Sequence, residues 1–570
     1  VYAAFILAGG LILHGCNGIF DDLAINPNQP SMGAYFTSPS AVNDAVMTMY
    51  GYMSTQRCLG ASGSKTTIIR SDEASSNSDY GKPGMFGADL NASYYTIEQP
   101  YTLMYTTASQ ASYIIETAPS VDFSGNEEMR NAYMGEAYFW RAFAHYYLLI
   151  NFRNISPIRQ MPRNGDDYVR PLEKPAAVWN FIQEDLAHAK ELLPVKGYWD
   201  SKNAGRVTKA SAAALLGKAY LYRSGIEQDY GEDKTTFYSE AAKEFGDVID
   251  GKYGTYDLTK NYADNFDVAH ENNEESILEF QFLGDVDNAG FNPGLATSGL
   301  AFDSRGLMLP GAGVGYEGVV HNWLYNAFVN SVDKDGYTDI RMFSTMIFND
   351  LDASIHLRND AGGNPVRLEG PGGYKWEELY PAKNGKEGFA TVSNPLAHSF
   401  KAGIRKGIDC SMPTQTEADG TPKLVGVGAG VKEYVYNQPR AHGVNWRYIR
   451  YADVLMMYAE AIVSGGTQAS NMTPLQAVNK VRGRVNMSEL PSVTMTDIQN
   501  ERILEFALEG HRFYDLLRWG KLASRFTELQ ESDPNFKKFI SADDFKGFVT
   551  NKHEWLPIPI NEVNSNPYIT

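Results

Sequence analysis

The sequence predicts a mainly α protein, a scaffold of helical hairpins that carries long loop-rich insertions and a few short strands. Apolar residues recur at helical spacing from about residue 100 to 250 and again after residue 446. Between these segments, glycine and polar residues interrupt the chain too often for long helices. At 570 residues the chain exceeds the usual length of one domain, but a helical scaffold with insertions accommodates that length without separate globules.

The N-terminal stretch predicts a signal peptide, a lipidation site and a tether. Residues 1–15 are apolar, carry no charge at neutral pH apart from any on His14, and are too short for a comfortable membrane span. The tetrapeptide LHGC that ends at Cys16 resembles a bacterial lipobox, although His14 departs from the usual small or apolar residue. This predicts acylation of Cys16 and anchoring to a membrane, with residues 16–39 as a tether rich in Asn, Asp, Pro and Ser. A buried segment with a chance cysteine is the alternative.

The next element is predicted to be a helix that begins at Ser40, whose hydroxyl can cap it. Its apolar face follows at helical spacing in Val42, Ala45, Val46, Met49 and Met53. Residues 60–98 are then rich in Gly, Ser, Asp and Asn, with tyrosines among them. A long polar loop inside a compact protein is usually functional or disordered, and the embedded aromatic residues favour function.

Residues 100–250 are nearly all predicted helix. Two of the apolar stripes are Met104, Ala108, Ala111, Ile115 and Val178, Ile182, Leu186, Ala189, Leu193. A third helix, at residues 207–224, is rich in alanine, which lets helices approach closely. Antiparallel pairs of helices of this length predict a tetratricopeptide-like helical-hairpin scaffold, whereas periodicity alone supports only helical hairpins because no strict repeat is visible.

Residues 253–445 change character and are predicted to be loops laid over the helices. Within them, a strand is expected at residues 276–282 and a short helix at residues 322–328. Helices resume after residue 446. The predicted organisation is an N-terminal helical scaffold, a loop-rich region and C-terminal helices that close the same scaffold, at residues 40–252, 253–445 and 446–570.

Three glutamates form a ladder near the C-terminus. Glu501, Glu505 and Glu509 follow one another at i, i+4, and each like-charge pair costs about 0.2–0.5 kcal/mol on an isolated helix. The helix is expected to begin at Thr496–Asp497 and to end at Gly510, which adopts a left-handed conformation readily. Cations should face the ladder, and the candidates are Arg447, Arg450, Arg512 and Arg518. We predict a buried ion-pair network that docks helices.

The charge balance excludes one class of partner. The chain has 50 basic and 68 acidic residues, a formal net charge of −18, and such a surface repels phosphate backbones. Nucleic acid is therefore not an expected partner, and ligands should be neutral or cationic. Aromatic residues make up 12% of the chain, including 35 tyrosines, which suits a binding surface if some of them face solvent.

Catalytic motifs do not stand out. The chain lacks a P-loop, a GxSxG elbow, a dinucleotide fingerprint and an HExxH pair. The glutamate ladder beside His511 is the catalytic alternative to the ion-pair network, and a carboxylate pair for glycoside hydrolysis has no motif to search for. Residues 333–339 partly match a calcium loop, but Thr338 and Ser344 stand where glycine and glutamate are required. A polar turn is favoured over calcium, and no cofactor is predicted.

Cysteine usage leaves the pairing question open. Apart from Cys16, the chain contains only Cys58 and Cys410, and neither belongs to a CxxC motif. One disulfide in an oxidising compartment and two buried thiols both fit.

Several blocks resemble one known family. The sequence NERILEFALEGHRFYDLLRWGKL at residues 500–522 resembles the C-terminal signature of the SusD/RagB family of surface nutrient-binding lipoproteins. The blocks that match in the family's order are GEAYFWRAFAHYYLLINF, WNFIQEDLAHAKELLP, RVTKASAAALLGKAYLY, RYIRYADVLMMYAEA and LPIPINEVNSNP, which begin at residues 135, 179, 206, 447 and 556.

The resemblance implies both a fold and a function. It implies a SusD-like fold and a surface-exposed, lipid-anchored protein of the outer membrane that is not an enzyme. Such a protein binds a glycan (oligosaccharide) and delivers it to a TonB-dependent SusC-like transporter for nutrient uptake. A peptide ligand, as in the RagB branch, and a glycan-degrading enzyme are the alternatives. Because the chain starts at Val1 and family members run past the NP at residues 566–567, we expect a fragment truncated at both ends.

Glycan binding requires flat aromatic faces for the C–H side of the sugar rings and polar groups for the hydroxyls. We therefore expect ligand-binding residues in the polar and glycine-rich loops, with residues 253–445 as the main ligand-binding region. The candidates are Tyr80, Tyr316, Tyr374 and Trp376 for stacking, and Arg70, Asp72 and Asp79 for hydrogen bonds. The family does not fix these residues. A shared site requires residues 60–98 and 310–380 to lie on one side of the scaffold.

Overall fold

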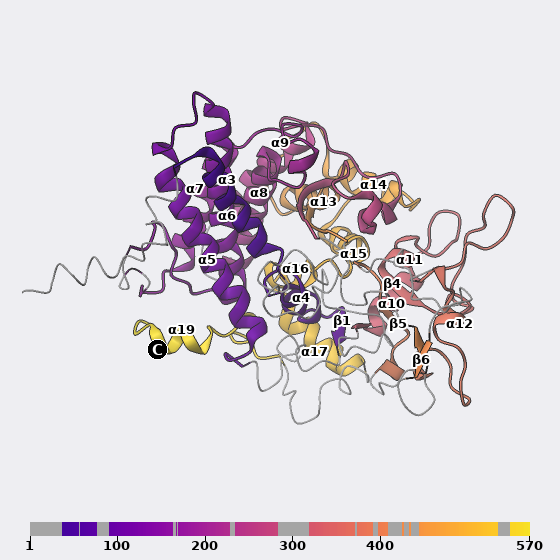
Figure 1. The fold of residues 1–570 in the computed structure, drawn as a ribbon. Coiled ribbons are helices and arrows are strands. Elements are labelled where there is room, and N and C mark those ends of the chain that lie inside the picture. The colour runs from indigo at the N-terminus through magenta and orange to yellow at the C-terminus, as the bar shows by residue number, and fades with distance from the viewer. Residues whose placement is uncertain are drawn as a thin grey trace, which may run out of the picture.

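The structure is a computed structural model of the chain. It describes residues 37–55, 57–76, 91–163, 167, 169–227, 234–282, 318–370, 373–391, 397–407, 424–426, 432–434, 444–533 and 548–569. These residues form a mainly α, tetratricopeptide-like scaffold with long loop-rich insertions and a few short strands, as predicted (Figure 1).

The helices of the N-terminal half pack in chain order. They are α3 (Pro39–Met53), α5 (Tyr95–Thr117), α6 (Glu127–Phe152), α7 (Pro175–Leu192), α8 (Lys209–Ile226) and α9 (Lys234–Ile249). From α5 to α9, each helix packs against the next, which gives the predicted helical hairpins (Figure 1). The alanine-rich α8 is buried along most of its length, because its small side chains allow neighbours on several sides.

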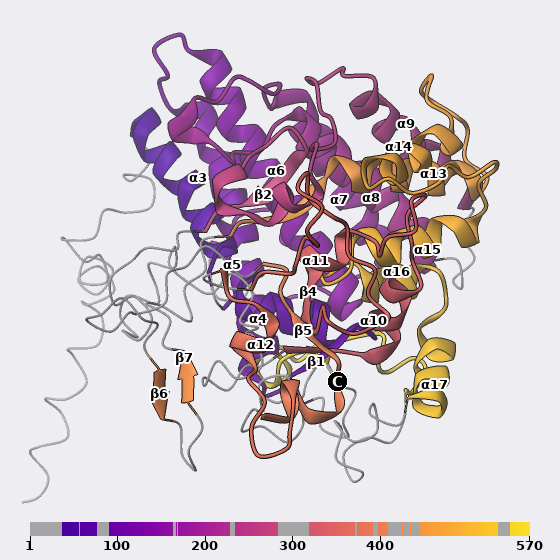
Figure 2. The same ribbon diagram turned by 90° about the vertical axis from the view of Figure 1, so that its right-hand side faces the viewer.

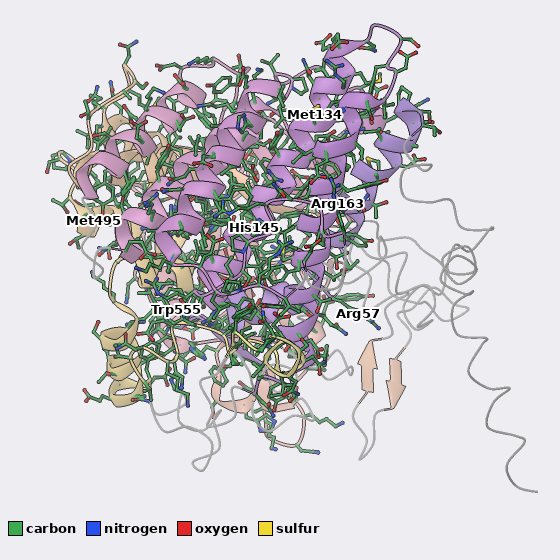
Figure 3. All side chains as sticks on the ribbon, turned by 90° about the vertical axis from the view of Figure 1, so that its left-hand side faces the viewer. Arg57, Met134, His145, Arg163, Met495 and Trp555 are labelled. Atoms are coloured by element: carbon green, nitrogen blue, oxygen red, sulfur yellow. The ribbon has the colours of Figure 1, made fainter. Side chains whose placement is uncertain are left out.

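The C-terminal helices continue this scaffold. They are α13 (Tyr451–Val463), α14 (Pro474–Arg484), α15 (Met495–Glu505), α16 (Arg512–Arg518), α17 (Leu522–Ser532) and α19 (Ile560–Ser565). Helix α13 packs against α9, and α16 packs against α8 (Figure 2). One apolar core runs through both halves of the chain, and Figure 3 shows how side chains fill the spaces between the helices. The two predicted helical segments therefore share one core.

Two predicted helix starts are corrected by the structure. Helix α3 is capped by Ser38, whose hydroxyl oxygen accepts the Ala41 N–H at 3.3 Å, and not by Ser40. Helix α15 is capped by Thr494, which forms a reciprocal capping box with Asp497. In both cases the cap lies two or three residues earlier than predicted, because the residues that follow it also tolerate helical backbone.

Short strands form three small sheets. They are β1 (Ala74–Ser76), β2 (Ser276–Phe280), β3 (Gly318–Val320), β4 (Met346–Phe348), β5 (Ala402–Ile404), β6 (Leu424–Gly426), β7 (Lys432–Tyr434) and β8 (Trp446–Arg450). The largest sheet has the order β1-β3-β5-β4 with every pair antiparallel, and β2 pairs with β8 and β6 with β7. The remaining short elements are α4 (Ala61–Ser64), α10 (Asn322–Val329), α11 (Arg341–Thr345), α12 (Trp376–Leu379), a π-helix at Lys65–Ile69, and 3₁₀ turns at Ala118–Ser120, Ser201–Asn203, Tyr262–Phe266, Val268–His270, Gly388–Thr391 and Ala397–Ser399.

The first part of the predicted polar loop at residues 60–98 is ordered structure instead. Residues 61–76 form α4, the π-helix and β1, and most of their described side chains are buried. Their hydroxyls satisfy the local backbone, since Thr66 and Thr67 both donate to the Gly63 carbonyl. Polar composition predicted a solvated loop here, but serine and threonine can instead be buried when their hydroxyls find backbone acceptors.

A second apolar core lies under the largest sheet. We call the described residues of 318–407 the lobe. Its core contains Val319, Phe328, Ile347 and Trp376, and it is completed by apolar side chains from residues 68–74 and 507–508. The lobe is therefore a packed unit and not only a set of loops laid over the helices, which corrects the prediction for this part of the chain.

Candidate functional site

The two predicted ligand-binding loops meet the described structure at one place. Strand β1 ends at Ser76, the last described residue before 91, and β3 begins at Gly318, the first after 282. Ser76 and Gly318 are register partners in the antiparallel β1–β3 pair. The chain therefore leaves β1 and enters β3 at the same end of the sheet, as the shared-site hypothesis requires of these loop ends.

Asp72, two residues before β1, holds the opposite end of the β1–β3 pair to the C-terminal helices. Its carboxylate accepts hydrogen bonds from Arg512 (2.9 and 3.0 Å) on α16 and from Arg525 (2.6 Å) on α17. Burial alone would raise the pKa of Asp72, but the two guanidinium groups outweigh it and lower that pKa. Asp72 was predicted to contact ligand. The structure gives it a positioning role instead, because its side chain is fully buried in these ion pairs.

A histidine and a tryptophan from the start of α10 meet the backbone of Asp72. His321 Nδ1 lies 2.8 Å from the Asp72 carbonyl oxygen and its Nε2 lies 2.6 Å from Ser75 Oγ. Because a carbonyl only accepts, Nδ1 carries the proton and Nε2 accepts the Ser75 hydroxyl. The Trp323 indole N–H donates to the same carbonyl, and the Arg525 guanidinium lies 4.2 Å from its ring centroid. Sequence reasoning did not assign a role to either residue.

Glu73 is a buried carboxyl at the same place. It accepts the Leu508 backbone N–H at 2.8 Å and the Ser71 hydroxyl at 3.1 Å. Burial raises the pKa of Glu73 to about 7, and the hydrogen bond from Leu508 opposes this rise only in part. Leu508 has a positive φ of 60°, which is unusual for a residue with a branched side chain, so Glu73 stabilises a strained turn between α15 and α16.

Arg70 also has a structural role, in contrast to its prediction as a ligand contact. It donates to Asn151 Oδ1 at 3.1 Å and to the Glu554 carbonyl at 2.8 Å, and it lies 4.0 Å from the Phe513 ring centroid. Burial lowers the pKa of Arg70 to about 10. With no exposed surface, this guanidinium joins α6, α16 and the C-terminal segment below the sheet.

Trp376 packs inside the lobe. Its ring lies 4.6 Å from that of Tyr380 and 5.0 Å from that of Phe389, and only 7% of the residue is exposed. A ring buried on this scale does not present a flat face to a sugar, so its predicted stacking role is corrected to packing. Tyr374, two residues earlier, is half-buried and stays a candidate.

Several predicted residues lie outside the described part of the chain. These are Tyr80, Asp79, Tyr316, Cys16 and Cys410. Of the two alternatives left open for the cysteines, the structure fits buried thiols, because Cys58 is free and buried. Where the structure describes the chain, no helix is both long and apolar enough to cross a membrane.

The glutamate ladder is a buried ion-pair network, as predicted. Glu505 accepts from Arg450 at 2.7 Å, Arg341 at 3.0 Å and also from Arg484. Glu501 pairs with Arg341 and Arg482, and Glu509 pairs with Arg450 and Lys406. Of the four predicted cations, only Arg450 pairs with the ladder. The other three pair elsewhere, Arg447 with Glu279, Arg512 with Asp72 and Arg518 with Glu460.

His511 completes this buried charge cluster without the surroundings of an active site. Its Nδ1 lies 3.3 Å from Lys218 Nζ, which also pairs with Asp453 at 3.2 Å. Burial and the neighbouring Lys218 lower the pKa of His511 to about 3, so the imidazole is neutral. The ring is 4% exposed, which leaves no room for a substrate beside it.

The partial calcium loop is a closed polar turn in the structure. Asp333 Oδ1 accepts the backbone N–H groups of Asp335 and Tyr337, each at 2.9 Å. Its Oδ2 pairs with Arg358. Both oxygens thus have protein donors, and no group of three or more metal-ligating side chains occurs among the described residues.

Comparisons with known proteins agree with this architecture. Residues 415–570 match the family described as the SusD family, and residues 25–221 match the family described as "Starch-binding associating with outer membrane". A SusD-like protein of Bacteroides ovatus is 25% identical over 522 residues, which cover 90% of this chain and 81% of that protein.

Two solved structures illustrate the likeness in fold. A SusD superfamily protein from Bacteroides vulgatus superimposes with a TM-score of 0.67 at 22% identity, covering 94% of this chain and 99% of its own. Surface glycan-binding protein A from Bacteroides thetaiotaomicron, solved in complex with laminarihexaose, gives a TM-score of 0.67 at 18% identity and the same coverage of 94% and 99%. At these identities the likeness shows the fold.

Proposed function

We propose, from the premise that this chain belongs to the SusD/RagB family, that it is a non-catalytic glycan-binding lipoprotein of the outer membrane. In this proposal it is exposed on the cell surface, is anchored by a lipid on Cys16, and delivers oligosaccharide to a SusC-like TonB-dependent transporter. The relatives support glycan as the ligand class: one matched family is described as starch-binding, and one structural neighbour carries laminarihexaose.

The observation that carries the proposal is the pairing of Ser76 with Gly318. Ser76 and Gly318 are far apart in sequence, and each adjoins a segment that contains a predicted stacking tyrosine, Tyr80 after Ser76 and Tyr316 before Gly318. At the other end of the same strand pair, the buried contacts of Asp72, His321 and Trp323 hold β1 and β3 in place. Rigid support of loops that carry a binding site reduces the ordering cost of binding.

A shallow site of this kind binds modestly. Stacking on a few aromatic rings with polar groups for the hydroxyls should give dissociation constants of roughly micromolar to millimolar, about −8 to −4 kcal/mol. Weak capture suits the proposed delivery, because the ligand must be released to the transporter.

The proposal is tested by titrating the purified protein with a panel of neutral oligosaccharides and peptides while analysing the mixture for shortened products. We expect binding of at least one oligosaccharide without cleavage. Peptide binding alone would support the RagB-like alternative, and shortened glycans would support an enzyme.

A pair of variants locates the site. Tyr316→Ala should weaken glycan binding by about tenfold, which corresponds to one lost stacking contact. Tyr568→Ala removes a tyrosine that is 58% exposed in the C-terminal segment and should leave binding unchanged. Equal affinity of both variants for the glycan would contradict the proposed position of the site.

A further inference from the structure

A cavity lies between α5 and α19, in a different part of the molecule from the β1–β3 junction. Its volume is about 310 Å³, near the lower end of the range for small-molecule sites. Its walls come from α5, the segments around residues 156–158 and 167–170, and the C-terminal residues 559–565. Figure 1 shows α19 near one end of α5, and the Ile560 N–H donates to the Ala92 carbonyl at 3.0 Å.

Four of the hydroxyl groups that line this cavity already donate their protons within the protein. Thr106, Ser109 and Ser565 each donate to a backbone carbonyl of their own helix, at 2.9, 3.0 and 2.8 Å. Ser156 donates to the carbonyls of residues 170 and 171, both at 3.0 Å. These oxygens therefore retain only lone pairs for a ligand, and they act as acceptors.

The charged side chains that line the cavity are also mostly hydrogen-bond acceptors, because three of the four are carboxylates. Glu98, Asp167 and Glu562 line the cavity against a single cation, Arg170. Two of the donor atoms present are engaged by the protein: Asn561 Nδ2 donates to Glu98, and Arg170 Nη1 donates to a backbone carbonyl at 3.3 Å. A lining that is rich in acceptors and negatively charged fits a ligand rich in N–H donors.

Two aromatic rings form part of the wall. The rings of Tyr101 and Tyr105 have centroids 4.8 Å apart and are tilted by 57°. Both residues line the cavity, but Tyr101 is only 4% exposed, so the half-buried Tyr105 offers the accessible ring. An ammonium group over such a ring is stabilised by the negative π-face, more strongly where water is excluded.

We propose that this cavity binds a small organic cation that carries a primary ammonium group, such as a protonated diamine or an amino sugar. The ammonium would donate its hydrogen bonds to the carboxylates and hydroxyl oxygens, and the carbon skeleton would lie against Tyr105. This site is separate from the proposed glycan site, so either proposal can fail without the other.

Calorimetric titration of the whole protein tests this inference with four small molecules. We expect 1,4-diaminobutane or glucosamine to bind, with an affinity that falls as salt is added. Glucose, which is neutral, and glucuronate, which is anionic, should give no binding. The ratio of the two amine affinities distinguishes a diamine from an amino sugar. Binding of glucose as tight as that of the amines, or binding of neither amine, overturns the inference.

Three variants assign the binding to this cavity. Glu562→Gln should weaken amine binding by at least about tenfold, and Thr106→Phe, which fills the space, should weaken it at least as much. Glu531→Gln makes the same charge change at an exposed position of α17 that does not line the cavity, and it should bind like the parent. Circular dichroism establishes that each variant is folded. Unchanged amine affinity in both folded cavity variants overturns the inference.

Discussion

The interactions that stabilise the helical scaffold differ in kind from those that attach the lobe to it. The scaffold buries apolar stripes from successive helices, such as the face of α3 from Val42 to Met53, in one continuous core. The lobe has a small apolar core of its own, which residues 68–74 and 507–508 complete, and it also joins the scaffold through buried charges. Arg341 pairs with Glu501 and Glu505 at the junction.

Apolar packing and buried ion pairs differ in how narrowly each restricts the neighbouring side chain. An apolar face tolerates many neighbours of about the right size, whereas a buried carboxylate requires a cation at hydrogen-bonding distance. Removing one ionic partner leaves an uncompensated charge in the interior, so the scaffold–lobe junction should respond to single substitutions more sharply than the scaffold does.

The largest effect is expected at the centre of the ladder. Glu505→Ala leaves Arg341, Arg450 and Arg484 with one carboxylate fewer in a fully buried site, and we expect it to lower the free energy of unfolding by roughly 4–5 kcal/mol. Thermal or urea unfolding measures this change. The matched control is Glu127→Ala on α6, whose carboxylate is 60% exposed, and it should cost at most about 1 kcal/mol. Similar costs for the two variants would show that the network is not what fixes the lobe.

A somewhat smaller effect is expected inside the lobe. Trp376→Ala removes a ring that packs on Tyr380 and Phe389, and we expect a loss of about 3 kcal/mol. Hydrogen exchange should show faster opening of lobe amides while α6 and α8 keep their protection. Equal loss of protection in both regions would mean that the scaffold and the lobe unfold as one unit.

The third prediction concerns pH and the junction residue Glu73. The pKa of Glu73 is raised to about 7, so the folded protein keeps the Glu73 proton up to about that pH. The unfolded chain releases the same proton at lower pH, because there the Glu73 pKa is lower. Stability should therefore fall as pH rises from about 4.5 to 7 and stay low above that, by roughly 3 kcal/mol for this group.

Glu73→Gln mimics the protonated carboxyl and isolates this contribution. The variant should gain stability relative to the parent at pH 8 and lose that advantage at pH 4.5. The pH dependence of stability that Glu509 contributes has the opposite sign. The pKa of Glu509 is lowered to about 2, because Arg450 and Lys406 outweigh the effect of burial. Its contribution is lost only on acidification through about pH 4 to 2. A difference between the Glu73→Gln variant and the parent that does not vary with pH would refute the assignment.

The smallest effect is expected at a helix end of the scaffold. Ser38→Ala removes the observed cap of α3 and should cost about 1 kcal/mol, measured by thermal unfolding. Ser40→Ala, at the cap position expected from sequence, should cost less than about 0.5 kcal/mol. The reverse order would show that the helix begins where the sequence indicated.

Local patterns predicted the scaffold because its information is local. The five residues of the predicted apolar stripe of α3 are all buried, at the positions i, i+3, i+4, i+7 and i+11 counted from Val42. The ladder was predictable only in part. Its three glutamates are visible as a repeated spacing, but Lys406 lies 103 residues from Glu509, and Arg341 lies 160 from Glu501. Residue spacing carries no signal over such separations.

The candidate site shows the same limit. Composition singled out Arg70 and Asp72 as polar residues near a loop and assigned them to a ligand. Whether a charged side chain faces water or a buried partner depends on distant residues, here Phe513 for Arg70 and Arg512 for Asp72. His321 lies at the end of β3, and only the strand pairing shows that it meets Ser75.

The ion pairs of Asp72 have a consequence for the order of events during synthesis. Its partners Arg512 and Arg525 follow it by 440 and 453 residues. A ribosome therefore produces most of the chain before this carboxylate can meet a counter-charge. Until then, the start of β1 is not held to α16 and α17 by these ion pairs. Contacts of such long sequence separation form late and slowly. The junction that supports the proposed glycan surface should accordingly be among the last parts of the molecule to mature, and a nascent chain stalled before α16 should hold a folded scaffold but no competent surface.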